Sequence, residues 1–457
     1  MDFSRKNVLV VGSGKSGIAA VKLLLAAGAN PVLQDGNEKL NEELLQEKVG
    51  DISLLPGQGI FYVIGELPED VKDALDFAVL SPGVPTDSPL VNELRERNIW
   101  ILGEIELAYA FEKGDVLAIT GTNGKTTTTT LLGEIMKRHA KQVFVVGNIG
   151  NPYTDEVTGS CETSVTVAEI SSFQLETIHK FCPVVSAILN ITPDHLDRHH
   201  TMENYKKAKE DIAKNQTKDH VCVLNYEDPY GRAYADSCPA RVVFFSSAHE
   251  LADGFYYKEE CIYRARNGVS EKLMNIHEMA LLGMHNVENV MAAIAMADAY
   301  GVSMDTILDA VRSFKAVEHR IEYVDTKNGV DYYNDSKGTN PDAAIKGIRA
   351  MVKPTYLIGG GYDKHSDYDE WIESFDGKVV KLVLIGQTKE KIAACAKKHG
   401  FDNCVFAESL QEAVDYCSSH AKAGEAVLLS PACASWGMFP NYEVRGNMFK
   451  EMVRALN

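Results

Sequence analysis

The 457-residue chain carries 46 Lys and Arg against 64 Asp and Glu, so its formal net charge is −18. This length exceeds one ordinary hydrophobic core and predicts about three domains of roughly 150 residues each. The acidic balance argues against a nucleic-acid partner, because a phosphate backbone is bound by a surplus of Lys and Arg.

Short β-branched runs alternate with segments of helical periodicity, which is typical of parallel sheets with crossover helices. The predicted strands are 7–11, a strand ending near Asp35, 77–80, 116–120, 143–146, 165–169, 184–189, 221–224, 321–325, 355–358, 381–385 and 426–429. Helices are predicted around 18–27, from the loop at 121–126 to about His139, and around 202–215 and 286–300. The fold class is therefore α/β, with three domains predicted at 1–107, 108–316 and 317–457, because the pattern restarts near Ala316.

Nine cysteines are scattered without a C-x-x-C pair, which argues against a zinc ribbon and fits a reducing compartment. The N-terminal residues lack the apolar core of a signal peptide, and no apolar run approaches the roughly 18 residues that span a bilayer. We therefore expect a cytoplasmic protein without membrane insertion. No coiled-coil heptads or apolar patch can be read from the chain, and a monomer is expected.

The most specific motif is the loop ITGTNGKT at 119–126, which lies between a predicted strand and a predicted helix. Backbone amides of Asn123–Thr126 suit phosphates, Lys125 supplies a point charge, and the Thr126 hydroxyl suits Mg²⁺. The usual G-x-x-x-x-G-K-[ST] motif has glycine where this chain has Ile119, so a shorter loop is expected. A nucleotide site is favoured over a chance turn, and Thr127–Thr130 are expected mainly to pack the helix start.

A second glycine loop, GSGKSG at 12–17, satisfies G-x-G-x-x-G after a strand and before a helix. Asp35 follows about 20 residues later, where dinucleotide-binding proteins place the acid that bonds a ribose hydroxyl. By itself this loop leaves NAD or FAD, another diphosphate, or no ligand as open alternatives.

Acidic, amide and histidine residues fall at other predicted strand ends, where ligands of open α/β sheets bind. Glu169 suits a hard metal ion, and Asn148 either binds an oxygen-rich ligand or forms a plain turn. The histidine-rich run 192–200 is either a solvated loop or part of a site. For such a site Mg²⁺ or Mn²⁺ fits better than structural zinc, because the run contains Asp and no Cys. Lys209 is by default a surface lysine.

The last domain offers short polar motifs beside its strands, at 318–320, 334–340, 359–364 and 430–435. Arg320 and Lys337 are suited to clamp phosphate or carboxylate. Taken singly, each of these motifs is equally compatible with an ordinary loop.

Together the motifs resemble the Mur ligases, the ATP-dependent amide-forming enzymes of peptidoglycan precursor synthesis. The resemblance covers nearly the whole chain. It rests on GTNGKT at 121–126, Glu169, DHLDRH at 194–199, Arg320, SPG at 81–83, NDSKGTN at 334–340 and SPACAS at 430–435. The last three motifs are most similar to those of the family members that add D-glutamate.

The resemblance implies a Rossmann-like N-terminal domain that binds a UDP-sugar, a central P-loop ATPase domain with a mainly parallel sheet, and a Rossmann-like C-terminal domain that binds the amino acid. It implies three substrates, ATP, UDP-N-acetylmuramoyl-L-alanine and D-glutamate, and two Mg²⁺ ions, with Mn²⁺ as an alternative. The implied reaction activates the L-alanyl carboxylate as an acyl phosphate, which the amine of D-glutamate attacks.

The resemblance also implies roles for individual residues. The implied catalytic residues are Lys125, Glu169, His195 and Lys209, with Lys209 carbamylated, and the implied metal ligands are Thr126, Glu169, His195 and Lys209. The implied ATP-binding residues are Gly121, Thr122, Asn123, Gly124, Lys125, Thr126, Thr127, Asn286, Asn289, Arg320 and Asp335. The implied substrate-binding residues are Gly14, Lys15, Ser16, Asp35, Ser81, Pro82, Gly83 and Asn148, and for D-glutamate Thr339, Lys364, Ser435 and Tyr442.

Some positions depart from the family pattern. Gly338, Trp436 and Tyr442 stand where alanine, leucine and phenylalanine are usual, and the pair His199–His200 is also unusual. Three alternatives remain: another amide ligase of the same superfamily, an NAD-dependent oxidoreductase built on the first glycine loop, and a non-catalytic nucleotide-binding regulator.

Overall fold

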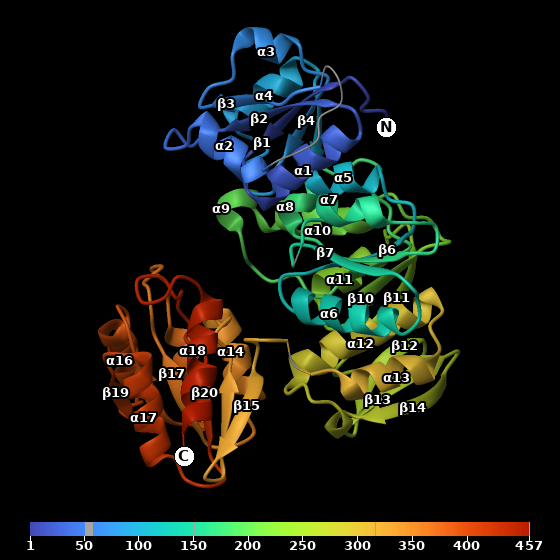
Figure 1. The fold of residues 1–457 in the computed structure, drawn as a ribbon. Helices are drawn as coiled ribbons and strands as arrows, with labels where there is room; N and C mark the ends of the chain where they lie inside the picture. The colour runs from blue at the N-terminus through green and yellow to red at the C-terminus, as the bar shows by residue number, and fades with distance from the viewer. Residues whose placement is uncertain (51–57, 150, 316, 457) are drawn as a thin grey trace. The chain divides into compact units, whose positions relative to one another are not determined.

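The computed structural model describes residues 1–50, 58–149, 151–315 and 317–456, and within these ranges the chain forms three α/β domains, each built on one sheet (Figure 1). Ala316, the residue at the predicted second boundary, lies outside the described residues. The predicted α/β class is confirmed, and every strand predicted from the sequence is present with bounds shifted by a few residues.

The N-terminal sheet is entirely parallel, with the order β3-β2-β1-β4-β5. Its strands are β1 (Asn7–Val11), β2 (Asn30–Asp35), β3 (Phe61–Ile64), β4 (Phe77–Leu80) and β5 (Trp100–Gly103). Its helices are α1 (Lys15–Ala26), α2 (Glu42–Val49), α3 (Glu69–Asp73), α4 (Pro89–Glu96) and α5 (Glu104–Tyr109). The apolar run of β1 is buried on both faces, as crossover helices on a parallel sheet require.

The central sheet has the order β14-β13-β12-β11-β10-β9-β6-β8-β7 and is parallel from β7 to β12. Its strands are β6 (Asp115–Thr120), β7 (Val143–Gly147), β8 (Val165–Glu169), β9 (Val185–Ile188), β10 (Val221–Asn225), β11 (Arg241–Ser246), β12 (Gly254–Lys258), β13 (Cys261–Arg266) and β14 (Val269–Asn275). The associated helices are α6 (Lys125–Lys137), α7 (Tyr153–Glu156), α8 (Ser172–Leu175), α9 (Leu196–His199), α10 (Met202–Glu210), α11 (Pro229–Tyr234), α12 (Met284–Tyr300) and α13 (Met304–Ser313).

The C-terminal sheet has the order β15-β16-β20-β17-β18-β19, parallel except for the antiparallel pair β15–β16. Its strands are β15 (Glu322–Lys327), β16 (Val330–Asn334), β17 (Thr355–Gly359), β18 (Val379–Leu384), β19 (Cys404–Phe406) and β20 (Ala426–Leu429). Its helices are α14 (Pro341–Ala350), α15 (Asp369–Glu373), α16 (Lys389–Lys398), α17 (Leu410–His420) and α18 (Tyr442–Ala455).

The sequence analysis missed three antiparallel hairpins of the described chain, β12–β13, β13–β14 and β15–β16, and the last two turn at Asn-Gly pairs. Strands β13 and β14 are joined by Asn267 and Gly268, whose φ angles are 49° and 75°. Strands β15 and β16 are joined by Asn328 and Gly329, with φ angles of 52° and 78°. Two successive positive φ angles are typical of a type I′ turn, which Asn-Gly pairs favour, so this dipeptide was the available signal.

The three sheets divide between two compact units. The first unit, 1–276 with 288–312, contains the N-terminal and central sheets, and the second unit, 277–287 with 313–457, contains the C-terminal sheet. One hydrophobic cluster includes Val8 and Leu24 of the N-terminal domain together with Ala118 and Ala168 of the central sheet. A core that is continuous between the first two sheets explains why they form one unit.

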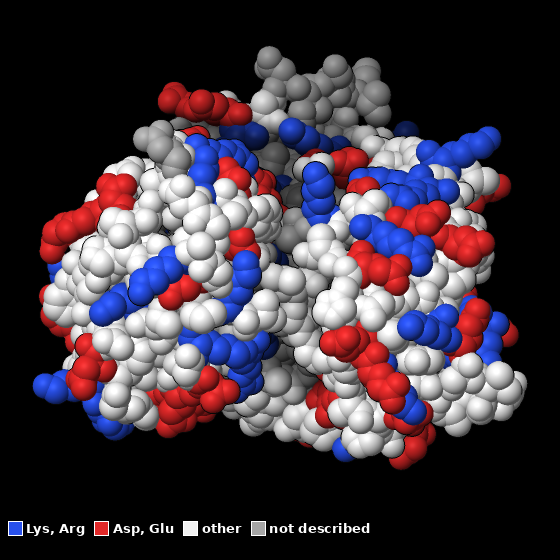
Figure 2. Space-filling model, turned by 90° about the horizontal axis from the view of Figure 1, so that it is seen from below, with Lys and Arg blue, Asp and Glu red and all other residues white. Residues whose placement is uncertain are grey.

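The described surface is of mixed charge on the face drawn in Figure 2, where Lys and Arg side chains are interspersed with Asp and Glu. Within the described ranges, none of the helices combines the length and the apolarity that crossing a bilayer requires.

Candidate active site

The loop between β6 and α6 contains the residues expected to bind ATP phosphates. Gly121 and Gly124 have φ angles of 149° and 87°. A Cβ added at Gly124 would lie 2.1 Å from Oδ1 of Asn289, so this turn requires glycine. Ile119 lies inside β6 and is fully buried, which explains why the glycine of the longer motif is absent here.

Asn190 ties this loop to the chain that follows β9. Its carbonyl oxygen accepts the Thr122 N–H at 2.8 Å, its Oδ1 accepts the Asn123 N–H at 2.8 Å, and its Nδ2 donates to the Asn123 carbonyl at 3.0 Å. In this structure the Asn123 N–H is therefore held by Asn190, a residue that the sequence analysis missed. The first turn of α6, from Lys125, has the positive end of a helix dipole, which favours an anion.

The threonine run after Lys125 packs the start of α6, as predicted. Thr127, Thr128 and Thr129 are buried, and the Thr130 hydroxyl donates to the Thr126 carbonyl at 2.7 Å.

Two lysine ammonium groups converge on one carbonyl oxygen of the loop. Lys125 Nζ donates to the Gly121 oxygen at 2.8 Å, and Lys209 Nζ donates to the same oxygen at 2.9 Å. Lys209 is only 2% exposed and its Nζ lies 4.6 Å from the centre of the Tyr205 ring, so the default expectation of a surface lysine is wrong. Burial, reinforced by the Lys125 charge and opposed by Asp194, holds the pKa of Lys209 well below its ordinary value.

Glu169 lies at the end of β8, beside β6. Its Oε1 accepts a hydrogen bond from Asn148 Nδ2 at 2.9 Å, and its backbone oxygen accepts the Asn148 N–H at 2.8 Å. Within the described part of the chain, its buried Oε2 accepts no hydrogen bond. A buried carboxylate oxygen without a donor is unfavourable unless a cation faces it, so Glu169 fits a hard divalent ion such as Mg²⁺.

The histidine-rich run divides into three environments. His195 is exposed, with φ 51°, and its ring lies 4.9 Å from the Phe173 ring, centre to centre, in a T-shaped contact. His199 is buried and its Nε2 lies 2.9 Å from the Ser172 hydroxyl oxygen, whereas His200 is exposed and pairs with Asp87 at 3.2 Å. Among the described residues, neither Glu169 nor His195 belongs to a group of three His, Cys, Asp or Glu ligands. The expected set of Glu169, His195 and Lys209 therefore stays a prediction.

The first glycine loop has the geometry that its motif predicts. Gly12 has a φ of 97°, and a Cβ at Gly17 would lie 1.8 Å from the Gly12 carbonyl oxygen, so α1 packs directly against the loop. Asp35 Oδ2 accepts hydrogen bonds from the backbone N–H and the hydroxyl of Ser13, at 2.9 and 2.6 Å. Asp35 thus holds the loop in place, and its contact with a ligand stays a prediction.

The expected UDP-sugar residues lie at the carboxyl ends of neighbouring strands of the N-terminal sheet. Gly14, Lys15 and Ser16 are at the start of α1, and 81–83 follow β4, the strand that pairs with β1. The Ser81 hydroxyl donates to the Gly12 oxygen at 3.3 Å. A small pocket beside these strand ends is lined by Ser81, Pro82, Gln174 and Arg198 among others, so two segments that are distant in sequence meet here.

Arg198 joins the N-terminal and central domains. Its guanidinium donates to the Val84 carbonyl at 2.9 Å and to Glu176 at 2.7 Å, and it lies over the Phe173 ring. The Thr86 hydroxyl donates to the same carboxylate at 3.1 Å. The sequence analysis quoted Arg198 only within a motif and missed Glu176, because nothing local signals a contact between domains.

The second unit contains Asp335 at the end of β16, expected at the ATP site. Its Oδ2 accepts a hydrogen bond from the Ser430 hydroxyl at 2.7 Å. Burial raises the pKa of Asp335 to about 7, although that hydrogen bond and the charges of Arg320 and Arg445 act in the opposite direction. A Cβ at Gly338 would lie 2.7 Å from the same Oδ2 and 3.0 Å from the Ser430 hydroxyl oxygen, so a larger residue here would have to displace these side chains.

The residues expected to bind D-glutamate form two aromatic contacts. Lys337 Nζ lies 5.3 Å from the Tyr442 ring centre, and Lys364 Nζ lies 5.0 Å from the Trp436 ring centre. Trp436 also contacts Tyr362, with ring centres 5.7 Å apart.

The remaining expected residues make local contacts within their own domains. Thr339 donates its N–H to the Lys337 oxygen at 2.8 Å, and Ser435 is buried. Of the two α12 asparagines, Asn289 lies beside Gly124 in the first unit, whereas Asn286 donates its Nδ2 to the Leu282 oxygen at 2.8 Å within the second unit.

Similarity to known proteins extends over all three domains. Residues 6–103 match the Mur ligase MurD-like N-terminal domain, residues 119–297 the Mur ligase middle domain, and residues 319–433 the Mur ligase glutamate ligase domain. The UDP-N-acetylmuramoylalanine–D-glutamate ligase of Lachnospira eligens is 57% identical over 100% of both chains. That of Clostridioides difficile is 45% identical, again over 100% of both chains.

Solved structures share the fold at low identity. The UDP-N-acetylmuramate–alanine ligase MurC of Thermotoga maritima has a TM-score of 0.60 and 19% identity, covering 98% of this chain and 99% of that one. The MurF ligase of Thermotoga maritima in complex with ADP has a TM-score of 0.59 and 16% identity, covering 93% and 95%. The sequence matches and the three-domain fold agree, and this chain belongs to the Mur ligase family, among its UDP-N-acetylmuramoylalanine–D-glutamate ligases.

Proposed function

We propose that this protein is an ATP-dependent ligase that joins D-glutamate to UDP-N-acetylmuramoyl-L-alanine and releases ADP and phosphate. The observation that carries the proposal is the 57% identity, along both whole chains, to a relative named for this reaction. The site geometry supports it with a glycine loop at a helix N-terminus and two converging lysines.

Amide formation at neutral pH needs an activated carboxylate, because an oxide ion is not a feasible leaving group. An oxygen of the L-alanyl carboxylate attacks the γ-phosphorus of ATP, and the bond from that phosphorus to the ADP oxygen breaks. The D-glutamate amine, after losing a proton, then attacks the acyl carbon, and phosphate leaves. ATP is the proposed donor because a solved ligase of this fold holds ADP.

Lys125 lowers the repulsion between the attacking carboxylate and the phosphate. Its ammonium rests on the Gly121 and Thr122 carbonyls at 2.8 and 2.9 Å. Exchanging one of these neutral acceptors for a charged phosphate oxygen strengthens the hydrogen bond, since charge-assisted bonds are roughly twice as strong. Charge of this kind, held before the reaction begins, stabilises the transition state.

Lys209 contributes as a carbamate. Burial and the Lys125 charge lower the pKa of Lys209 and so favour its uncharged amine form. The lone pair of that form attacks the carbon of CO₂ while an N–H proton passes to water. The product is an anion beside Lys125 instead of a second buried cation. Carbamylation therefore removes the like-charge repulsion between the two lysines and creates an oxygen ligand.

Glu169, His195 and carbamylated Lys209 would hold one Mg²⁺ ion and the Thr126 hydroxyl a second, and Mn²⁺ is compatible with the same oxygen and nitrogen donors. The ions would supply positive charge beside the carboxylate and phosphate oxygens. The buried Oε2 of Glu169 supports this assignment, since it accepts no hydrogen bond from the described residues.

The substrates are assigned to the residues that the family resemblance implies. The edge formed by 14–16, Asp35 and 81–83, with Asn148, is assigned to the UDP-sugar. Thr339, Lys364, Ser435 and Tyr442 are assigned to D-glutamate, and Asn286, Asn289, Arg320 and Asp335 to ATP. Because ATP and the UDP-sugar are intracellular metabolites and the mechanism uses one chain, we assign the enzyme to the cytoplasm as a monomer.

The product mass tests the proposal directly. The protein is incubated with ATP, Mg²⁺, UDP-N-acetylmuramoyl-L-alanine and, separately, D-glutamate, L-glutamate and L-lysine. Only D-glutamate should give a condensed product, with one ADP released for each amide formed. A product with L-lysine alone would assign a different ligase of the family, and normal turnover by Lys125→Ala would refute the proposed mechanism.

A further inference from the structure

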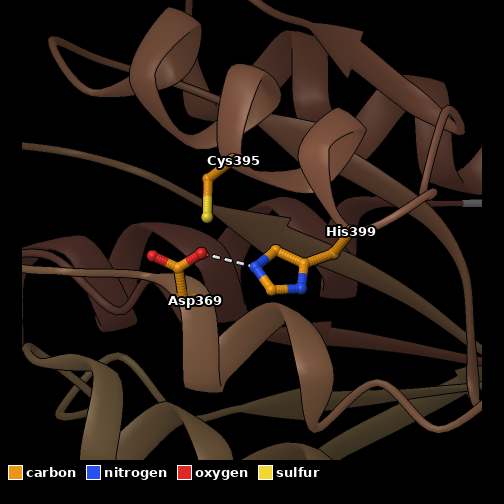
Figure 3. Close-up of side chains that lie close together, drawn as sticks. All are labelled: Asp369, Cys395 and His399. Carbon is orange, nitrogen blue, oxygen red and sulfur yellow. Dashed lines mark hydrogen bonds and ion pairs between the residues drawn. The ribbon is translucent and has the colours of Figure 1, made fainter.

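A cluster of three metal-binding side-chain types lies in the second unit, outside the residues assigned to ligation. Among the residues that the structure describes, Asp369, Cys395 and His399 are the one group of three whose candidate ligand atoms all lie within 4.8 Å of one another. Figure 3 shows the Asp369 carboxylate pointing toward the thiol of Cys395 and the imidazole of His399. Asp369 Oδ1 is 2.5 Å from His399 Nε2.

Two helices that pack against each other position these side chains. Cys395 and His399 are four residues apart at the end of α16, so they project from the same face one turn apart. Helix α15, which begins at Asp369, packs against α16. Trp371 of α15 and Ile392 of α16 are fully buried in one hydrophobic cluster. A packed core beside the cluster therefore preorganises its three side chains.

The donor atoms match zinc. A thiolate sulfur, an imidazole nitrogen and a carboxylate oxygen are its usual ligands, and a set of three protein ligands leaves one position for water. Around a tetrahedral zinc ion such atoms lie about 3.3 to 3.8 Å apart, as bond lengths of about 2.0 to 2.3 Å require. The observed separations are close enough to reach this geometry through side-chain rotations.

Glu373 supplies an outer contact of the kind that orients zinc-bound histidines. It follows Asp369 by one helical turn, and its Oε1 lies 3.5 Å from His399 Nδ1. In this structure Nε2 donates its proton to Asp369. When a metal ion takes the place of that proton, Glu373 can accept the remaining N–H on Nδ1 and so hold the tautomer that a metal ion needs.

The electrostatic surroundings favour a cation, with one competitor. Burial, reinforced by the negative charges of Asp369 and Asp367, raises the pKa of the Cys395 thiol to about 11. The competitor is Lys398, whose Nζ lies 2.6 Å from Asp369 Oδ1 and whose side chain is 69% exposed. Metal binding displaces this ammonium into solvent and releases the thiol proton to the buffer.

We propose that Asp369, Cys395 and His399 form a Zn²⁺ site, completed by water, which links α15 to α16. The site is separate from the ligase chemistry, in which oxygen ligands and Mg²⁺ are assigned. Its expected effect is to stabilise the second unit by binding only the folded state.

Co²⁺ provides a probe that distinguishes this site from the magnesium site. The full-length protein, stripped with a chelator, is titrated with Co²⁺ and its thiolate-to-cobalt charge-transfer absorption is recorded. One equivalent should produce the band, Zn²⁺ should remove it, and the band should be lost in Cys395→Ser. Because Glu169, His195 and Lys209 contain no sulfur, Co²⁺ at that site gives no such band.

Matched variants complete the test. Cys404→Ser, which changes a half-buried cysteine of the same unit, should leave the band unchanged. Glu373→Gln should weaken Zn²⁺ binding about tenfold or more, and Lys398→Met should tighten it. Zn²⁺ should raise the melting temperature of the wild type and not of Cys395→Ser. Absence of the thiolate band, or a band that survives Cys395→Ser, would overturn the proposal and leave the cluster as a surface ion pair.

Discussion

Replacing Asp335 by Asn should remove a large pH dependence from the stability of the second unit. Asp335 is 6% exposed, and burial raises its pKa from 3.8 to about 7. A carboxyl group with a raised folded-state pKa stabilises the fold fully below 3.8, and this contribution is lost as the pH rises through about 7. At about 1.4 kcal/mol for each pKa unit, the difference corresponds to about 4 kcal/mol.

The Asn side chain has the shape of the neutral carboxyl group, and its Oδ1 can accept the Ser430 hydrogen bond, which is 2.7 Å long in the wild type. The variant should therefore match the wild type near pH 4 and exceed its stability by about 4 kcal/mol near pH 8. Urea unfolding measures this difference through the fluorescence of Trp371, which is fully buried in the second unit. Trp100 and Trp436 are replaced by Phe in both proteins, so that Trp371 is the remaining tryptophan and its fluorescence reports unfolding of the second unit.

Asp331→Asn, in β16 just before Asp335, is a control with the opposite sign. Burial opposes ionisation of Asp331, but hydrogen bonds from Lys353 and Thr326 prevail and lower its pKa. Its contribution is present above 3.8 and lost as the pH falls, so Asp331→Asn should be the less stable protein at neutral pH. Equal stability of wild type and Asp335→Asn near pH 8 would show that the charges of Arg320 and Arg445 compensate the carboxylate, and would refute the reasoning.

Three further predictions concern the proposed site. Lys209→Met should abolish ligation. Its stability should stay within about 1 kcal/mol of the wild type or exceed it, because removing a buried ammonium offsets the lost hydrogen bond. A loss of more than about 2 kcal/mol in thermal unfolding would contradict this prediction. Gly124→Ala should weaken binding of an ATP analogue at least about tenfold by calorimetry, because its Cβ would lie 2.1 Å from a side-chain oxygen. Gly50→Ala, also at positive φ but with no described atom within 4 Å of its Cβ, should bind normally. Trp436→Leu should raise the KM for D-glutamate about two- to fivefold with little change in kcat, because Lys364 loses an aromatic contact. Trp436→Phe should keep a KM close to that of the wild type. Identical KM values for all three proteins would exclude a positioning role for Trp436.

Much of the fold was predictable because its signals are local. The parallel strands are short β-branched runs, and the two glycine loops lie between strand and helix as their motifs require. Two of the missed hairpins carried a signal as well, since Asn267–Gly268 and Asn328–Gly329 both adopt positive φ angles. They were overlooked because the alternating pattern around them is weak, as in the exposed residues of β14.

The site was less predictable, because its contacts join distant parts of the chain. Asn190 holds the phosphate loop from 67 residues away, and Glu176 accepts from Thr86 across 90 residues. No local pattern distinguishes such residues from ordinary loop positions. The carboxylate that would lie 2.7 Å from a Cβ at Gly338 was likewise visible only in the structure.

The sequence by itself determined the α/β class, many of the parallel strands, the glycines of both loops and the family, because backbone conformation and motif chemistry are encoded within a few neighbouring residues. Only the tertiary structure decided which ionisable groups are buried. Lys209 lies in a helix with two other lysines, and its burial follows from a contact with Gly121, 88 residues earlier. Asp335 meets Ser430, 95 residues later. Burial and neighbouring charge set a pKa, and both depend on residues that only folding brings together.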